Sequence, residues 1–307
     1  MTLQQICDFI AVAQHGSLHA AARMTGQAQP AISKSLRRLE ESLGAPLFVR
    51  GAKGIRLTPY GERFLGHARL ITSESERAKA GVAELLGNKL SVVRYGVSPM
   101  SSVLLAPGAV TGFRRKHPDA ELHSSSGLFH TLAPMLREGQ IDFAVCPAPD
   151  QPAPDLSQVE LVRCQVCVVA RPGHPLARAT SLEQLVDSTF VVGAPQGVAG
   201  AGVRGAFARL NLPPPKVDVY LDSMIDTLAF VSSTDRLALL PSLLMDTPLL
   251  RGDLTVLPIR EALTDFQTSL IYRRDTPLAS AAGTLSAMFE REASYLVSAR
   301  RKAAAGR

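Results

Sequence analysis

The spacing of apolar side chains predicts a helix between Gln29 and Gly44. Four of them recur at helical intervals and form one stripe: Ile32, Leu36, Leu39 and Leu43. Pro30 is typical of the first turn of a helix, and Gly44 is typical of its end. Lys34 and Arg37 fall on the side opposite the stripe. The pattern predicts a short helix with an apolar back and a basic, hydroxyl-bearing front.

Two shorter helices are expected before it. An apolar pattern over residues 3–13 indicates a first helix that Gly16 ends. Ser17 is a good N-cap for a second, short helix over residues 18–24, and residues 25–28 then form a tight turn. Helix, short helix, turn and helix together match the helix-turn-helix plan.

A basic hairpin is expected after it. Residues 45–50 and 55–58 are short β-rich runs that flank a glycine-rich tip. Arg50, Lys53 and Arg56 make this wing basic, which is fit for phosphates or a minor groove. The helix over residues 29–43 has the character that the major groove of DNA accepts.

A long helix is expected from Pro59 to about Gly87. Its apolar residues recur at approximately heptad spacing: Tyr60, Phe64, Ala68, Ile71, Ala78, Val82 and Leu85. About 29 residues make a helix of roughly 43 Å. One narrow stripe on so long a helix favours pairing with a second copy of the chain, and packing within the chain is the alternative. Residues 87–89 are expected to form a hinge.

Strands and helices alternate through the remaining two-thirds, which predicts an α/β domain of two Rossmann-like lobes. Expected strands cover residues 92–97, 120–124, 139–145, 166–170, 190–193, 217–221, 237–240, 255–257 and 269–272. A polar turn at 98–102 leads into an expected helix that runs through 115, and further helices are expected over 127–137, 181–187, 204–210, 223–231, a segment from 241, and 278–297. The predicted domains are 1–58, 59–88 and 89–307, with lobe I at about 89–161 and 267–300 and lobe II at about 162–266.

A cleft is expected where the strands of the two lobes end and the helices begin, because free N–H groups there hold anions. The candidate ligand contacts are Ser98, Met100, Ser101, Ser102, Leu128, Phe129, Cys146, Pro147, Gln196, Gly197, Val198 and Gly202. A purely structural role, without a ligand contact, stays open for each of these residues, because serine at a helix start is usually a cap and a glycine-rich turn is usually only a turn.

Charge is concentrated at the two ends of the chain. Residues 1–90 hold 12 Lys and Arg against 7 Asp and Glu, and Arg300, Arg301, Lys302 and Arg307 follow at the other end. The residues between these two ends, 91–299, therefore have no evident affinity for polyanions. The basic tail is expected to be a solvated, disordered end rather than a DNA contact. With no signal-type segment and no apolar run of membrane-spanning length, we expect a soluble, cytoplasmic protein.

The cysteines do not predict a metal or redox site. Cys164 and Cys167 form a Cys-x-x-Cys, but they lie in a β-rich run where positions i and i+3 face opposite sides. Cys7 and Cys146 lie elsewhere, and the histidines are scattered. We expect structural thiols, no metal, no cofactor and no catalytic residue.

The first 60 residues or so closely resemble the winged helix-turn-helix domain of LysR-type transcriptional regulators. The matching motifs are Phe9, Gly16-Ser17, Ala21-Ala22, Gln29-Pro30-Ala31-Ile32-Ser33, Leu39-Glu40, Leu43-Gly44, Leu47-Phe48-Val49-Arg50 and Leu57-Thr58-Pro59-Tyr60-Gly61. Gln27 departs from the family, which usually has an apolar residue there. This change predicts either a looser turn or a polar contact near the bases.

The resemblance extends more weakly over the α/β domain. Residues 113–118, 136–144 and 171–176 are similar to the family's effector domain, which resembles periplasmic binding proteins and binds small, often anionic, metabolites. Residues 232–241 replace the family's usual glycine-rich approach to a Leu-Pro element, so a different local backbone and ligand preference are expected. Residues after about Ser298 are unmatched.

The resemblance implies a transcriptional regulator that is controlled by a small-molecule effector. The implied partners are promoter DNA, an effector such as an organic acid, further copies of the chain as a homodimer or homotetramer, and RNA polymerase, with no membrane. The expected DNA contacts are Ser17, Gln29, Pro30, Ser33, Lys34, Arg37, Arg50 and Lys53. An effector shifts the DNA-bound assembly only by its differential affinity for two states.

Two other classes of protein remain as alternatives. A solute-binding protein for transport would share the α/β lobes, but it would need an export signal and would lack the wing. An enzyme would need a nucleophile elbow, phosphate loop, zinc motif or dinucleotide fingerprint, and residues 197–202 are too loose a glycine pattern to be one. Turnover of a metabolite without DNA would favour the enzyme.

Overall fold

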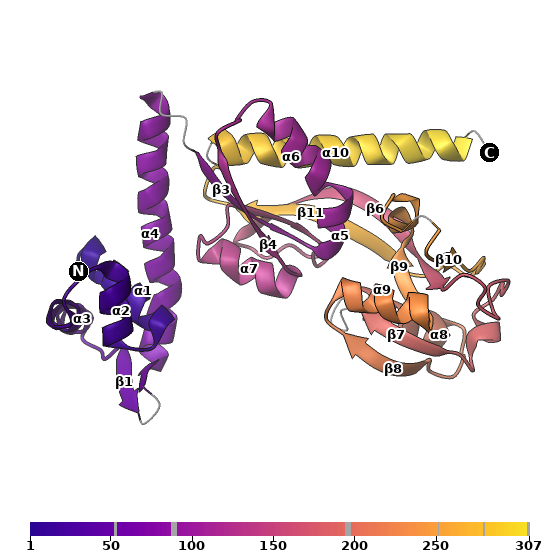
Figure 1. The fold of residues 1–307 in the computed structure, drawn as a ribbon, viewed down its shortest axis with the longest axis horizontal. Coiled ribbons are helices and arrows are strands. Elements are labelled where there is room, and N and C mark those ends of the chain that lie inside the picture. The colour runs from indigo at the N-terminus through magenta and orange to yellow at the C-terminus, as the bar shows by residue number, and fades with distance from the viewer. Residues whose placement is uncertain (52–53, 87–90, 194–197, 251, 279, 306–307) are drawn as a thin grey trace. The chain divides into compact units, whose positions relative to one another are not determined.

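Three helices and a hairpin form the N-terminal end of the chain in the computed structural model (Figure 1). They are α1 (Leu3–His15), α2 (Leu18–Thr25), α3 (Gln29–Leu43), β1 (Phe48–Gly51) and β2 (Gly54–Leu57). Each helix ends at a glycine in the left-handed conformation: Gly16, Gly26 and Gly44. Glycine adopts this conformation without a Cβ clash, so the three stops are set by sequence. The predicted winged helix-turn-helix is confirmed.

Phe9 lies at the centre of the N-terminal core. Its ring centroid is 5.2 Å from that of Phe48 and 5.1 Å from that of Phe64. The predicted stripe of α3 is buried against this core at Ile32, Leu36 and Leu39. Leu43, the fourth residue of that stripe, is 40% exposed because the helix ends there.

Two compact units can be distinguished. The structure describes residues 1–51, 54–86, 91–193, 198–250, 252–278 and 280–305. The first unit contains Met1–Arg94, Asp119–Leu122 and Ala133–Asp142, and the rest of the chain forms the second. The first unit thus takes in short segments that the sequence analysis assigned to the α/β domain.

Helix α4 (Pro59–Leu85) explains why those segments join the first unit. One part of the helix packs into the N-terminal core through Phe64, Leu65 and Ala68. Further along, the Ser73 hydroxyl donates to the carbonyl of Gly139 at 2.7 Å. Two ion pairs accompany this bond and join Arg69 to Glu138 and Arg77 to Asp142, each at 2.5 Å.

The second unit is built on alternating strands and helices. Its strands are β3 (Val92–Val97), β4 (Glu121–Ser126), β5 (Phe143–Cys146), β6 (Leu156–Ala170), β7 (Thr189–Gly193), β8 (Lys216–Leu221), β9 (Ala238–Pro241), β10 (Thr255–Val256) and β11 (Asp265–Arg273). Its helices are α5 (Pro99–Leu104), α6 (Ala106–Arg114), α7 (Phe129–Arg137), α8 (Val198–Arg209), α9 (Met224–Ser233) and α10 (Ser280–Ala305), with short 3-10 turns η1 (Glu183–Leu185) and η2 (Ser242–Asp246). β3, β4 and α7 each have a few residues in the first unit.

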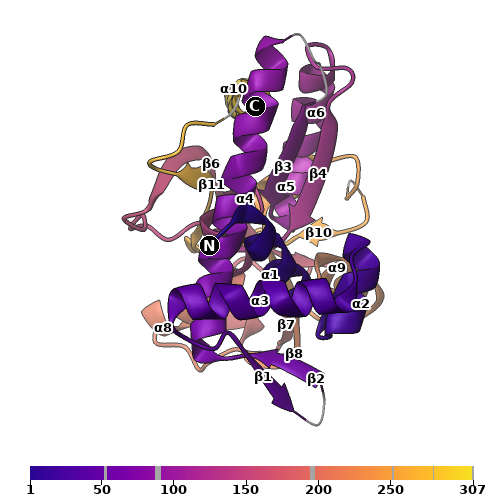
Figure 2. The same cartoon turned by 90° about the vertical axis from the view of Figure 1, so that its left-hand side faces the viewer.

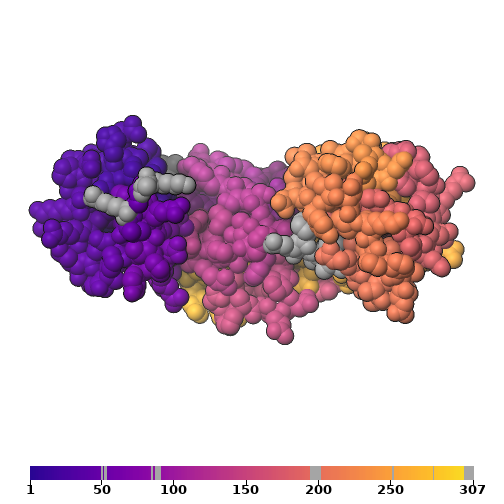
Figure 3. Space-filling model, turned by 90° about the horizontal axis from the view of Figure 1, so that it is seen from below, coloured from indigo at the N-terminus to yellow at the C-terminus, as the bar shows by residue number. Residues whose placement is uncertain are grey.

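One sheet runs in the order β10-β6-β11-β5-β3-β4, with β9 also paired to β6. Strands β7 and β8 pair in parallel, and a bridge from Phe190 to Leu237 connects β7 to the start of β9. We call the strands β3, β4, β5 and β11 lobe I and the strands β7 to β10 lobe II, with β6 crossing from one to the other. Figure 3 shows the β3–β5 part of lobe I, in magenta, and lobe II, in orange, as separate parts of the surface. The predicted α/β architecture is confirmed.

Several predicted elements differ from the observed ones. The polar turn expected at 98–102 is largely helical, in α5, and a separate helix, α6, follows with Pro107 in its first turn, because proline cannot donate to a continuing helix. The helices expected at 181–187 and after Pro241 are only the 3-10 turns η1 and η2, and β6 begins ten residues earlier than the strand expected at 166. α10 continues to Ala305 where a disordered tail was expected, and the Arg300 guanidinium donates to Ser242 at 2.8 Å.

No helix in the described part of the chain is both long enough and apolar enough to cross a membrane.

Candidate nucleic-acid interface

Helix α3 presents a polar face to solvent. Its back is buried in the core, while Gln29, Pro30, Lys34 and Arg37 are exposed and Ser33 is half-buried. Pro30 stands in the first turn, where its missing N–H has no helical acceptor to lose. Figure 2 shows α3 running across the unit above the β1–β2 hairpin. The structure therefore brings together most of the DNA contacts that the sequence predicted.

Arg37 already has a partner on its own helix. Its Nε lies 3.0 Å from Glu41 Oε1, and the two side chains are 81% and 61% exposed. Exposed pairs of this kind contribute little to stability, about 0–1 kcal/mol, so Arg37 can exchange Glu41 for a phosphate at small cost.

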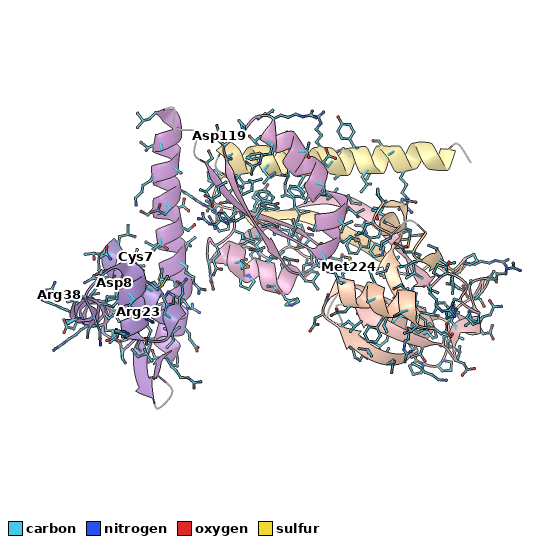
Figure 4. All side chains as sticks on the ribbon, in the orientation of Figure 1. Cys7, Asp8, Arg23, Arg38, Asp119 and Met224 are labelled. Atoms are coloured by element: carbon cyan, nitrogen blue, oxygen red, sulfur yellow. The ribbon has the colours of Figure 1, made fainter. Side chains whose placement is uncertain are left out.

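Arg38 was not among the predicted contacts, although it is exposed and projects outward from α3 (Figure 4). Its spacing of four residues from Lys34 was the signal for a shared helical face.

The other predicted DNA contacts have different surroundings. The Ser17 hydroxyl accepts from the Ala20 N–H at 3.1 Å, so it serves as the N-cap of α2. Arg50 lies in β1, but its side chain falls outside the described residues, as does all of Lys53. Arg56, on β2 opposite Val49, is exposed and supplies a described cation of the wing.

The wing is attached to the helices at both of its ends. At its start, Glu40 Oε1 of α3 accepts from the N–H groups of Leu47 at 2.7 Å and Phe48 at 3.2 Å. At its end, the Thr58 hydroxyl donates to the Pro46 carbonyl at 2.6 Å. Between these points, the Ile55 N–H donates to the Gly16 carbonyl at 3.1 Å.

A buried carboxylate holds the turn before α3. Asp8 of α1, labelled in Figure 4, is 1% exposed. Its Oδ1 accepts from the side-chain amides of Gln27 at 2.8 Å and Gln4 at 2.9 Å. Gln27, the residue that departs from the family pattern, therefore bonds inward to α1. This bond ties the turn down and directs the Gln27 amide away from a DNA-facing position.

In the second unit, three turns meet at the carboxyl edge of the lobe I strands. β3 and β5 are parallel, and the Ser98 N–H donates to the Val145 carbonyl at 2.9 Å. The Gly127 N–H donates to the Val97 carbonyl at 3.1 Å. The turns after β3, β4 and β5 therefore bring together the predicted ligand residues of this lobe: Ser98, Met100, Ser101, Ser102, Leu128, Phe129, Cys146 and Pro147.

These residues differ in what they can offer a ligand. Ser98 and Ser101 are buried and their hydroxyl oxygens lie 2.8 Å apart, while Met100 and Cys146 are also buried. Ser102 is exposed, and Leu128, Phe129 and Pro147 are half-buried. The eight residues include no cation, so an anion at this edge would depend on hydroxyl and N–H donors.

The predicted ligand residues of lobe II are less informative. Gln196 and Gly197 lie outside the described residues, and so does the side chain of Val198. Gly202 is buried in α8, where an added Cβ would lie 2.5 Å from Cγ2 of Thr264. Close packing of α8 thus gives a sufficient reason for glycine at this position.

The cysteines are free thiols. Burial raises the pKa of the Cys146 thiol to about 12 and that of Cys167 to about 12. Both thiols are therefore protonated at neutral pH and are poor nucleophiles. Within the described residues, no group of three His, Cys, Asp or Glu side chains has an arrangement that would hold a metal ion.

Two family descriptions match the chain. "Bacterial regulatory helix-turn-helix protein, lysR family" matches residues 3–62 and "LysR substrate binding domain" matches residues 89–294. The HTH-type transcriptional regulator GbpR of Azospirillum brasilense is 30% identical over 288 residues, which cover 92% of this chain and 84% of GbpR. PcaQ of Agrobacterium fabrum, also an HTH-type transcriptional regulator, is 28% identical over 272 residues, which cover 87% of each chain.

Solved structures have the same fold. CbnR, a LysR family transcriptional regulator, has a TM-score of 0.70 at 19% identity, with 95% of this chain and 99% of that chain covered. Full-length CbnR in complex with its target DNA has a TM-score of 0.69 at 20% identity, with 95% and 100% covered. Together with the domain matches and the geometry of α3 and the wing, these findings show that the chain belongs to the LysR family of DNA-binding transcriptional regulators and carries an effector-binding domain.

Proposed function

We propose that this regulator recognises its operator through the exposed face of α3. The observation that carries the proposal is the position of Lys34, Arg37 and Arg38 on the side of α3 opposite its buried stripe. Gln29 is suited to adenine edges, Pro30 and Ser33 to bases and phosphate, and the cations to guanine or phosphate. The wing cations would anchor the complex on the backbone.

Substitution of Lys34 by alanine tests this interface. Fluorescence anisotropy would measure the affinity of full-length protein for a duplex that the wild type selects from random sequence. We expect Lys34→Ala to lose about 1–3 kcal/mol if the side chain contacts a base. Lys79→Ala is the matched control, since it removes the same charge from an exposed position of α4. Unchanged affinity in Lys34→Ala would contradict the assignment of α3.

We further propose that a small organic acid, with an aromatic ring as a candidate feature, binds at the carboxyl edge of lobe I. Hydroxyls and N–H groups there suit one carboxylate, and Phe129 and Leu128 offer half-buried apolar surface. The absence of a cation among the eight predicted residues of this edge favours a singly charged acid over a polyanion. Gln196, Gly197, Val198 and Gly202, which belong to the predicted lobe II, stay candidate ligand contacts.

A thermal-shift screen of organic acids tests the effector proposal. An acid that binds the folded protein raises its melting temperature in a concentration-dependent way. Phe129→Ala should abolish that shift, whereas Leu210→Ala, at an exposed position just after α8, should leave it intact. A shift that survives Phe129→Ala would place the ligand elsewhere.

Self-association through α4 completes the proposal. Ile71, Ala78 and Val82 are exposed along one stripe of this helix, where a second copy would cover them. Val82→Glu should therefore lower the molar mass measured by sedimentation, and an unchanged mass would argue against this pairing.

We also propose that the protein acts on cytoplasmic DNA as a homodimer or homotetramer, without enzymatic activity, and that RNA polymerase is a further partner.

A further inference from the structure

Glu40 accepts hydrogen bonds from backbone N–H groups along the connection between α3 and the wing. Its backbone carbonyl accepts from the N–H groups of Gly44, which ends the helix, and Ala45, the latter at 3.3 Å. Its carboxylate then reaches Leu47 at 2.7 Å and Phe48 at 3.2 Å, through one oxygen, Oε1. One residue therefore satisfies four N–H groups between the end of α3 and the first residue of β1.

A carboxylate is otherwise unfavourable at this position. Glu40 lies near the C-terminal end of α3, where the helix dipole disfavours negative charge. It also belongs to the helix proposed to approach DNA phosphates. Its neighbour Glu41 is exposed and pairs with Arg37, whereas Glu40 is half-buried and turned toward the wing. The bonds to the wing are the compensating interaction that the structure offers for this charge.

The residues that Glu40 binds are themselves fixed in place. Leu47 is 2% exposed, and its carbonyl accepts from the Thr58 N–H at 2.9 Å. An added Cβ at Gly61 would lie 2.2 Å from that same carbonyl, so α4 leaves no room on this side. Phe48 packs against Phe9 in the core. Glu40 thus links α3 directly to an ordered strand and adds to the other contacts that hold the wing.

We propose that Glu40 is a positioning residue for DNA binding, which aligns Arg56 of the wing with a phosphate beside the groove that α3 enters. This inference rests on the proposed DNA interface. It predicts that loss of the Glu40 carboxylate removes the contribution of the wing while the α3 contacts persist. Arg56, an exposed cation on β2, reports on that contribution.

The test measures the affinity of full-length variants for the selected duplex over a range of salt concentrations. Each phosphate contact adds about 0.9 to the slope of log affinity against log salt. We expect Glu40→Ala and Arg56→Ala each to flatten the slope by about 1. The double variant should bind no more weakly than Arg56→Ala alone, because the wing contact is already lost. Glu40→Gln keeps one acceptor oxygen and should retain the wild-type slope, and Glu41→Gln should not flatten it.

A purely structural role would give a different result. If Glu40→Ala only destabilised the domain, it would weaken DNA binding without changing the salt slope. The double variant would then bind DNA more weakly than Arg56→Ala alone, by the full factor that Glu40→Ala costs. Either result overturns the proposal. Glu40→Asp tests the same point in a variant that keeps the charge, because its shorter side chain cannot reach both N–H groups. It should flatten the slope and speed hydrogen exchange at Leu47 and Phe48, and a wild-type slope overturns the inference. A wild-type protein without salt-sensitive DNA binding would instead refute the proposed function itself.

Discussion

Replacement of Gln27 by alanine should loosen the turn that leads into α3. The change removes the Gln27 donor to Asp8 Oδ1, and this 1% exposed carboxylate keeps the bond from Gln4. A hydrogen bond to a charged group contributes about 1.5–3 kcal/mol. Because Gln27 is only half-buried and water can partly replace its amide, we expect a loss of about 1–2 kcal/mol from the local stability of the turn.

Hydrogen exchange of the full-length protein measures this loss locally. Backbone amides over residues 21–31 should exchange about 5–30 times faster in Gln27→Ala, which corresponds to the expected loss. Gln14→Ala is the control, since Gln14 is an exposed amide on the same helix as Asp8. The effect should shrink in an Asp8→Ala background, because the acceptor is then absent. Equal acceleration with and without Asp8 would refute this account of the turn.

Three further predictions follow from other contacts. Glu41→Gln should raise DNA affinity a few-fold at low salt, because it frees Arg37 and removes a negative charge from α3; weaker anisotropy binding would contradict this. Asp142→Asn should speed hydrogen exchange in the middle of α4, since Arg77, whose side chain is 17% exposed, loses its carboxylate partner at 2.5 Å and keeps Glu74 at 3.7 Å; an unchanged rate would contradict it. Iodoacetamide at pH 8 should label Cys146 only in denaturant, because burial raises its pKa to about 12, and labelling of the native protein would refute this.

The sequence was most informative where local patterns decide the structure. The stripe of α3, the glycine that ends it and the hairpin after it follow from residue type and spacing, and all are observed. Alternating strands and helices likewise gave the α/β class. The prediction failed where local signals compete: the helix expected to run through Arg115 contained Pro107, so a helix that starts beside that proline could have been foreseen.

The contacts that organise the site could not be predicted from the sequence, because they join residues that lie far apart along the chain. Asp8 meets Gln27 across 19 positions of sequence, and Arg77 meets Asp142 across 65. Nothing in either local pattern selects these partners. Gly202 shows a different difficulty: a glycine in a turn-like run suggested a ligand contact, and close packing against Thr264 is a second reason for glycine there.

Strand β6 has a consequence for any movement between the lobes. It pairs with β11 from Leu156 to Gln165 and with β9 from Val166 to Val169, so a single strand serves both lobes. β11 returns beside it with a register shift at Thr268/Ser269. The two lobes are therefore joined by a continuous hydrogen-bonded ribbon rather than by a loose linker. Any closing motion must bend or twist that ribbon, and part of an effector's binding free energy would be stored as elastic deformation that drives reopening once the effector leaves.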